Sequence, residues 1–198
     1  MLQELICGKK VITISGAHSK VGKTLLAENI LSRLQGFCAI KTSVGNFKKE
    51  CVTDNPFDVM VPNKDTFRLK NAGAEKVIFV QCSRKDLSNA LKKALKITST
   101  YKGVIIEGNS VLKYIDPSLA IFVANENVKE LKESALLAIK KADIIVFNEK
   151  TPIYKDKDKI RNLIKTLNNK VPFITWNLTQ KTIPLLLDKY LKELSFCK

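Results

Sequence analysis

A polar segment bounded by glycines, Gly16-Ala17-His18-Ser19-Lys20-Val21-Gly22-Lys23-Thr24, carries the residue types that bind a polyphosphate. It follows an apolar β-branched run and precedes apolar residues at helical spacing, which predicts a strand, a phosphate loop and a helix. Backbone N–H groups would surround the phosphates, the Lys23 ammonium would reach the terminal ones, and the Thr24 hydroxyl would coordinate Mg²⁺. We therefore expect Mg²⁺ with GTP or ATP, contacted by Gly16, His18, Ser19, Lys20, Val21, Gly22, Lys23, Thr24 and Leu25.

The spacing of this loop differs from the commonest one. Counting back from Gly22, Ala17 stands where the first glycine is expected, and Gly16 lies one residue earlier. This spacing resembles the nucleotide loop of dethiobiotin synthetases and cobyrinate amidotransferases, within the P-loop class that includes the MinD-like ATPases. His18 stands where MinD-like ATPases carry a second lysine.

Three more candidate residues stand at the ends of apolar strands. Lys41 follows the run 37–40, and in a parallel sheet such an end faces the ligand crevice. Glu107 follows the run 104–106, where a carboxylate can hold Mg²⁺ or its water. Asn148 follows the run 144–147, and Asn148-Glu149-Lys150 is similar to the Asn-Lys pair with which many P-loop GTPases hold the purine ring. A plain strand-end turn is the alternative for Asn148.

Strand and helix patterns alternate along the chain, which predicts an α/β P-loop fold with a mainly parallel sheet of about seven strands and helices on both faces. Residues 42–62 show no period and are expected to be a long loop that determines substrate specificity. The chain is expected to be a single domain over residues 1–198. The expected strands are 11–15, 37–40, 76–82, 104–106, 119–123, 144–147 and 171–175, the last near a sheet edge because it contains Pro172. The expected helices are 25–34, 64–73, 87–97, 127–141, 160–167 and 183–194.

Composition limits the class of partner. The net charge of +15 is almost all lysine and is spread over the expected helices, which favours a solvated surface over nucleic-acid binding. No apolar run approaches the ~20 residues of a membrane span, and the start lacks the basic residues of a secretory signal, so a cytoplasmic protein without membrane contact is expected. Five widely spaced cysteines favour thiols over disulfides or a zinc site.

Several segments together resemble the GTP-binding protein family of molybdopterin-guanine dinucleotide biosynthesis, MobB. They are Gly22-Lys23-Thr24, Lys41, Asp58, Pro62-Asn63-Lys64-Asp65-Thr66-Phe67-Arg68, Ala72-Gly73-Ala74 and Glu107-Gly108. The resemblance implies a cytoplasmic homodimer that assists attachment of a guanine nucleotide to molybdopterin or another cofactor precursor. It also implies that Glu107 and Asp65 lie on the metal side and that Lys41 and Arg68 line the substrate side. Asn63 departs from the family pattern, which has a glycine before Lys64.

The activity that these features favour is a Mg²⁺-dependent nucleoside triphosphatase, with Lys23 and Glu107 as its catalytic residues. An ATP-dependent ligase or amidotransferase of the dethiobiotin synthetase or cobyrinate synthase type is one alternative, which the loop spacing favours. A nucleotide-gated adapter that delivers a metal cofactor without catalysis is another. A nucleic-acid binder driven by the positive charge is a weaker possibility.

Overall fold

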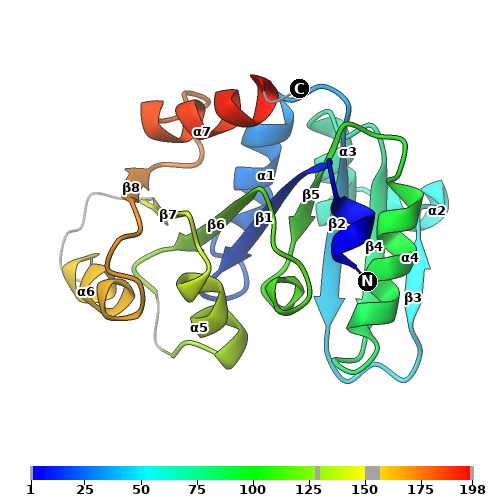
Figure 1. Ribbon diagram of the computed structural model, residues 1–198, viewed down its shortest axis with the longest axis horizontal. Helices are drawn as coiled ribbons and strands as arrows, with labels where there is room; N and C mark the ends of the chain where they lie inside the picture. The colour runs from blue at the N-terminus through cyan, green and yellow to red at the C-terminus, as the bar shows by residue number, and fades with distance from the viewer. Residues whose placement is uncertain (1, 128–129, 150–156, 197–198) are drawn as a thin grey trace.

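The central feature of the computed structural model is an eight-stranded sheet in the order β3-β4-β2-β5-β1-β6-β7-β8 (Figure 1). The structure describes residues 2–127, 130–149 and 157–196. Every neighbouring pair of strands is parallel except β3 and β4. The predicted fold class, an α/β fold with a mainly parallel sheet, is therefore confirmed. The strands are β1 (Lys10–Gly16), β2 (Phe37–Val44), β3 (Cys51–Thr53), β4 (Val77–Cys82), β5 (Gly103–Glu107), β6 (Leu119–Ala124), β7 (Ile144–Asn148) and β8 (Phe173–Trp176).

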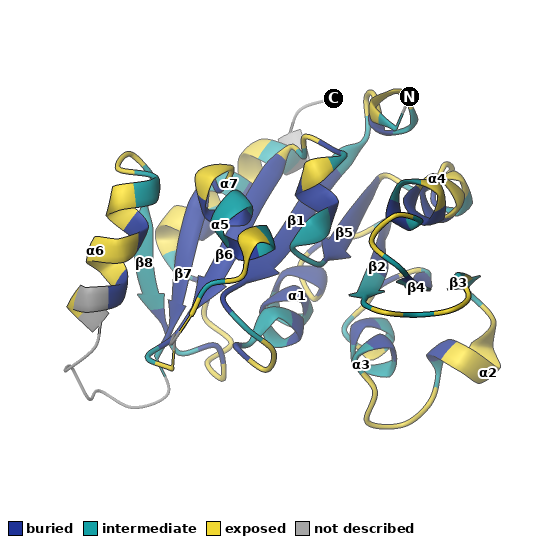
Figure 2. Cartoon of the chain, turned by 90° about the horizontal axis from the view of Figure 1, so that it is seen from below, coloured by how far each residue is buried: buried dark blue, intermediate teal, exposed yellow. Residues whose placement is uncertain are grey.

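Helices cover both faces of this sheet. Figure 2 shows α1 and α3 on one side of the strands and α4 and α5 on the other, as expected when the chain moves outward from β1 to β4 and later returns through right-handed crossovers. The helices are α1 (Lys23–Leu31), α2 (Pro56–Val59), α3 (Asp65–Asn71), α4 (Leu87–Ile97), α5 (Glu133–Lys140), α6 (Lys157–Leu167) and α7 (Leu185–Phe196), with 3₁₀ turns η1 (Gln3–Ile6) and η2 (Ser110–Lys113). None of the described helices is both long and apolar enough to cross a bilayer.

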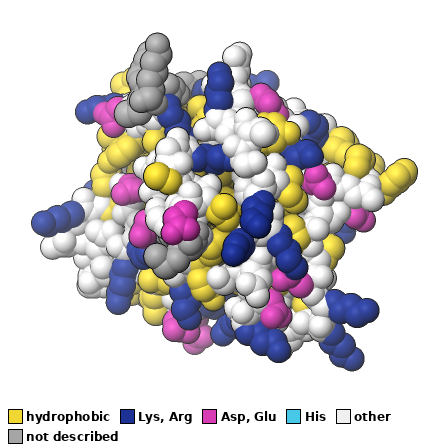
Figure 3. All heavy atoms as spheres, turned by 45° about the vertical axis from the view of Figure 1, so that its right-hand side comes forward, with side chains coloured by type: hydrophobic (Ala, Val, Ile, Leu, Met, Phe, Trp, Pro, Cys, Tyr) yellow, Lys and Arg dark blue, Asp and Glu magenta, His cyan; other side chains and the backbone are white. Residues whose placement is uncertain are grey.

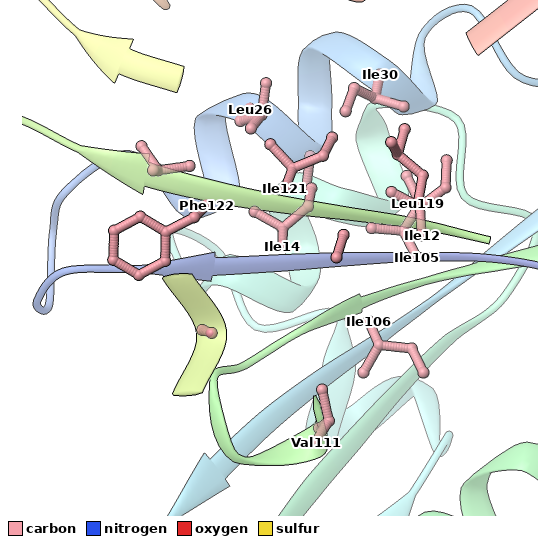
Figure 4. Close-up of a cluster of buried hydrophobic side chains, with 14 of the residues drawn as sticks. Ile12, Ile14, Leu26, Ile30, Ile105, Ile106, Val111, Leu119, Ile121 and Phe122 are labelled. Carbon is pink, nitrogen blue, oxygen red and sulfur yellow. The ribbon is translucent and has the colours of Figure 1, made fainter. Parts of the chain in front are cut away.

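The core is richest around the three central strands. All residues of β5 and β6 are buried, as are all of β1 after Lys10, which is typical of strands covered by helices on both faces. Figure 4 shows Leu26 and Ile30 of α1 beside Ile14 of β1 and Ile121 of β6, and all four are at most 1% exposed. This packing fixes the start of α1 directly beyond the end of β1.

The differences from the sequence prediction lie mainly in residues 42–62. This segment is not one long loop, because β2 continues to Val44, and the short strand β3 and the one-turn helix α2 follow. Strand β3 is the eighth strand, absent from the seven predicted, and it pairs antiparallel with β4 at the sheet edge.

Two further elements can be compared with the prediction. Helix α5 begins at Glu133 rather than near residue 127, and residues 128–129 of the expected helix lie outside the described residues. Strand β8 lies at the opposite edge, as predicted from Pro172.

Candidate nucleotide-binding site

The phosphate loop connects the end of β1 at Gly16 to the start of α1 at Lys23. Gly22 caps the helix with φ 115°, a left-handed conformation that favours glycine. A side chain at this position would also meet the Asn148 carboxamide, because an added Cβ would lie 2.7 Å from Asn148 Nδ2. The first N–H groups of α1 are therefore directed toward the loop, in the arrangement that binds phosphate at a helix N-terminus.

Lys23 lies along the inside of this loop. Its Nζ donates to the carbonyl oxygen of His18 over 3.0 Å, so the side chain spans the segment where a phosphate chain would lie. Burial lowers the pKa of the Lys23 ammonium, and the nearby Glu107 carboxylate partly offsets that effect. The side chain therefore presents a positive charge that is only partly neutralised by its surroundings.

Glu107 is the centre of a polar group buried beside the loop. The register of the parallel strands places Lys41 of β2 next to Glu107 of β5, and Lys41 Nζ donates to Glu107 Oε1. The other carboxylate oxygen accepts a 2.8 Å hydrogen bond from the Thr24 hydroxyl, at the start of α1. Glu107 is only 2% exposed, so these charged and polar partners compensate for the loss of water around its carboxylate.

Asp65 joins this group from α3. Its Oδ2 lies 2.6 Å from Lys41 Nζ. Burial would raise the pKa of Asp65, but hydrogen bonding to Lys41 and attraction from it, with smaller contributions from Thr24 and Arg68, lower the pKa overall. The structure thus brings together three oxygen donors from separate elements: the Thr24 hydroxyl and the carboxylates of Glu107 and Asp65. Hydroxyl and carboxylate oxygens are the protein ligands that Mg²⁺ prefers, so the donor set fits that ion.

Two asparagines at the ends of other strands, β5 and β7, support the phosphate loop. Asn109, just beyond β5, exchanges two hydrogen bonds with the backbone of Gly16, each of 2.8 Å. Asn148, the last residue of β7, donates to the Val21 carbonyl oxygen over 3.0 Å and accepts from the Leu178 N–H over 3.4 Å. Both side chains are therefore bonded to backbone groups and hold the two ends of the loop.

The middle of the loop is more exposed. The His18 ring contacts Asn125, at the end of β6, through a 2.8 Å pairing of Nε2 with Oδ1. Ser19 and Lys20 are exposed, and Lys20 adopts a positive φ of 63°. These residues form the rim of the site, whereas Gly16 and Val21 are buried beneath it.

Arg68 has a different partner from the other predicted site residues. Its guanidinium makes a two-pronged ion pair with Glu28 of α1, with N–O distances of 2.8 and 2.6 Å. Hydrogen bonding to Glu28 raises the pKa of Arg68. The pair lines a hollow of ≈ 380 Å³ between α1 and α3, together with Asn63, Phe67, Asn71 and Ala72. Because Glu28 follows Thr24, and Arg68 follows Asp65, by about one helical turn, this hollow adjoins the oxygen-donor group.

The structure therefore places the predicted residues in three positions. Thr24, Lys41, Asp65 and Glu107 form one contact group, and Lys23 lies near enough to be influenced by the Glu107 charge. The loop beside this group is formed or adjoined by Gly16, His18, Ser19, Lys20, Val21, Gly22 and Leu25. Arg68 is one helical turn away, in the hollow, and Asn148 lies under the loop. Lys150 of the proposed Asn-Lys pair lies outside the described residues.

Sequence reasoning missed three residues that shape this site. Asn109, Asn125 and Glu28 were not predicted, although they bond to Gly16, His18 and Arg68 respectively. For Asn109 and Asn125 a signal existed, since each is a polar residue just past a buried strand next to β1. Glu28 had no such signal, because its position on the face of α1 that meets α3 depends on how those helices pack.

The chain matches a known protein family. The family model of molybdopterin guanine dinucleotide synthesis protein B, MobB, matches residues 11–142. No curated protein sequence matches the chain.

Solved structures share the fold at low sequence identity. The hydrogenase maturation factor HypB from Archaeoglobus fulgidus is 18% identical, with a TM-score of 0.62, covering 98% of this chain and 93% of that one. HypB from Helicobacter pylori, solved in complex with nickel, is 14% identical, with a TM-score of 0.54 over 96% of this chain and 85% of that one. An LAO/AO transport system kinase is also 14% identical, with a TM-score of 0.54 over 98% and 62% of the respective chains.

Proposed function

Because this chain belongs to the family of molybdopterin guanine dinucleotide synthesis protein B, we propose that it binds a purine nucleoside triphosphate with Mg²⁺ and hydrolyses it. We further propose that this activity assists biosynthesis of the molybdenum cofactor in its guanine dinucleotide form. The observation that carries the proposal is the contact between Thr24, at the end of the phosphate loop, and the buried carboxylate of Glu107. This contact places a carboxylate oxygen beside the hydroxyl that directly follows the loop lysine, where the two oxygens could hold a metal ion next to the phosphates.

Each residue of the site has a definite task in this proposal. The loop N–H groups and the Lys23 ammonium would bind the β- and γ-phosphates and offset the charge that develops on them during transfer. Thr24, Glu107 and Asp65 would hold Mg²⁺, directly or through its water. The ion supplies charge neutralisation and a fixed phosphate geometry when it is bound. The chain's own contribution is therefore mostly positioning and electrostatics.

We infer that the base is guanine. Asn148 lies beneath the loop, and the Leu178 N–H bonded to it comes from the segment directly after β8. Asn148 is buried, and its carboxamide is already bonded to the Val21 carbonyl oxygen and the Leu178 N–H. The inference of guanine therefore rests on the family, whose members serve guanine dinucleotide synthesis, and not on a free donor of Asn148. Adenine is the alternative, and the nucleotide titration described in the Discussion separates the two.

We place the second substrate, a molybdopterin or related cofactor precursor, in the hollow between α1 and α3. Phe67 offers a ring, and Arg68, Glu28 and Asn63 offer hydrogen-bonding groups around it. The hollow lies one helical turn from Thr24 and Asp65, close enough for a bound group to be near the terminal phosphate. The homodimer and the cytoplasmic location implied by the family remain part of the proposal.

The loop spacing also favours a second function, an ATP-dependent ligase or amidotransferase. In that case phosphate release would require a small second substrate and would not occur with nucleotide alone. A nucleotide-gated adapter would instead bind nucleotide tightly without turnover. Phosphate release, measured with and without cofactor precursor, distinguishes these activities.

The direct test of the proposed site compares Lys23→Ala with Lys96→Ala. Lys96 is an exposed lysine on α4, so its variant controls for the loss of one positive charge. We expect Lys23→Ala to lose nucleotide binding, measured by calorimetry, while Lys96→Ala binds like the wild type. Normal binding by Lys23→Ala would refute the assignment of the phosphate site.

A further inference from the structure

The geometry points to Lys41 as a built-in counter-ion that occupies the divalent-cation position between Glu107 and Asp65 until Mg²⁺ arrives together with a nucleotide. The inference deepens the proposed function, since it concerns how the same site acquires its metal. It makes metal binding depend on the triphosphate.

The contacts of Lys41 resemble those of a bridging cation. Its Nζ contacts Glu107 Oε1 and lies 2.6 Å from Asp65 Oδ2, so one ammonium joins two carboxylates that come from β5 and α3. The remaining Glu107 oxygen is bonded to the Thr24 hydroxyl. A divalent ion that used these three oxygen donors would have to occupy the space that the ammonium fills. Lys41 and the ion therefore compete for one position.

Burial favours Lys41 over a metal ion in this competition. The side chain of Lys41 is 17% exposed and that of Glu107 is 2% exposed, so an ammonium displaced from the carboxylates would remain in a largely buried place. Leaving one member of a buried ion pair without its partner is strongly unfavourable. A metal ion on its own gives the displaced Lys41 no new anion. A bound triphosphate would, because the loop N–H groups and Lys23 would hold its terminal oxygens beside this group.

Removal of the ammonium should therefore uncover a metal site that needs no nucleotide. In Lys41→Met the side chain keeps a similar length but loses its charge, leaving two carboxylates and a hydroxyl without their cation. We expect electron paramagnetic resonance of Mn²⁺ to show at least tenfold tighter binding to Lys41→Met than to the wild type, both without nucleotide. The wild type should reach comparable affinity only when nucleotide is present.

A matched control comes from a second lysine–aspartate pair. Lys76 lies 2.6 Å from Asp54, the same distance, but bonds to this single carboxylate. Lys76→Met also removes one charge from an ion pair, and we expect it to bind Mn²⁺ no better than the wild type. Equal gains in Lys41→Met and Lys76→Met would overturn the inference, because the gain would then follow from net charge.

Two more variants complete the test. The double variant Lys41→Met/Asp65→Asn should lose the Mn²⁺ affinity gained by Lys41→Met, and Lys41→Arg should keep the wild-type dependence on nucleotide because a cation remains. Tight Mn²⁺ binding by the wild type without nucleotide would overturn the inference even if Lys41→Met did not fold. These nucleotide-free measurements are separate from the proposed function, which fails instead if the wild type binds no nucleotide.

Discussion

Asn109→Ala tests whether the phosphate loop is held in place before its ligand arrives. The Asn109 carboxamide accepts from the Gly16 N–H and donates to the Gly16 carbonyl oxygen, both over 2.8 Å. Gly16 is the residue at which β1 ends and the loop begins. Truncation to alanine removes both bonds, so the start of the loop becomes free to take other conformations.

The size of the effect follows from the number of bonds lost. A neutral hydrogen bond contributes about 0.5–1.5 kcal/mol to stability, and Asn109 is half-buried, so water replaces part of each bond. The free energy of unfolding should fall by about 1–2 kcal/mol, which lowers Tm by roughly 2–8 °C for a chain of this size. If the nucleotide binds only the ordered loop, its affinity should fall by up to about 5–30-fold, the factor that corresponds to this energy.

The assay is thermal unfolding of wild type, Asn109→Ala and the neighbouring Ser110→Ala, followed by calorimetric titration with nucleotide. Ser110→Ala should retain wild-type stability and affinity, since its side chain takes no part in the contact with Gly16. The reasoning is refuted if Asn109→Ala unfolds at the wild-type temperature and binds nucleotide equally well. A loss of stability with unchanged affinity would show that the loop orders equally well without this clamp.

Four other measurements test separate parts of the structure. Glu107→Gln removes the buried charge that would face the metal, so the Mg²⁺ concentration needed for half-maximal nucleotide binding should rise at least tenfold; an unchanged metal titration would exclude that role. Burial raises the pKa of the Cys38 thiol to about 11, so thiol reagents at pH 8 should label the exposed Cys51 but not Cys38 in the folded protein, as mass spectrometry of labelled peptides would show. Because the unfolded Cys38 thiol ionises near pH 9 and the folded one only near 11, stability should fall across that interval, and Cys38→Ala should flatten this fall. The Glu28–Arg68 pair is 22% and 40% exposed, so a double-mutant cycle on unfolding should give a coupling energy of about 1 kcal/mol or less; a clearly larger coupling would contradict the assignment of this pair to a hydrated hollow.

The fold class and the strand–loop–helix unit were predictable because their signals are local. β-branched runs, a glycine-bounded polar segment and a helical apolar pattern follow one another between residues 11 and 34, and each signal depends only on neighbouring residues. The antiparallel strand β3 was not predictable in this way. It has three residues, Cys51–Thr53, and its pairing with β4 is a contact with residues 79–81 that no short period reveals.

The site residues also differ in whether their signals are local or depend on contacts between distant parts of the chain. Lys41 and Glu107 were predicted from their places at strand ends, and the strand register then made them direct neighbours. Arg68 was predicted to line the substrate side, but its ion pair with Glu28 depends on the packing of α1 against α3, which a residue pattern does not specify. The roles of all these residues in binding or turnover stay predictions until variants are measured.

The most direct test of the central claim is a titration of the purified protein with ATP and with GTP, each with and without Mg²⁺, followed by thermal unfolding. A ligand at 100 times its Kd stabilises the folded state by about 2.7 kcal/mol, which should raise Tm by roughly 5–10 °C. We predict this increase for GTP with Mg²⁺ and a smaller one for ATP or for GTP alone. No change with either nucleotide would contradict the proposed site, and a preference for ATP with Mg²⁺ would favour the ligase.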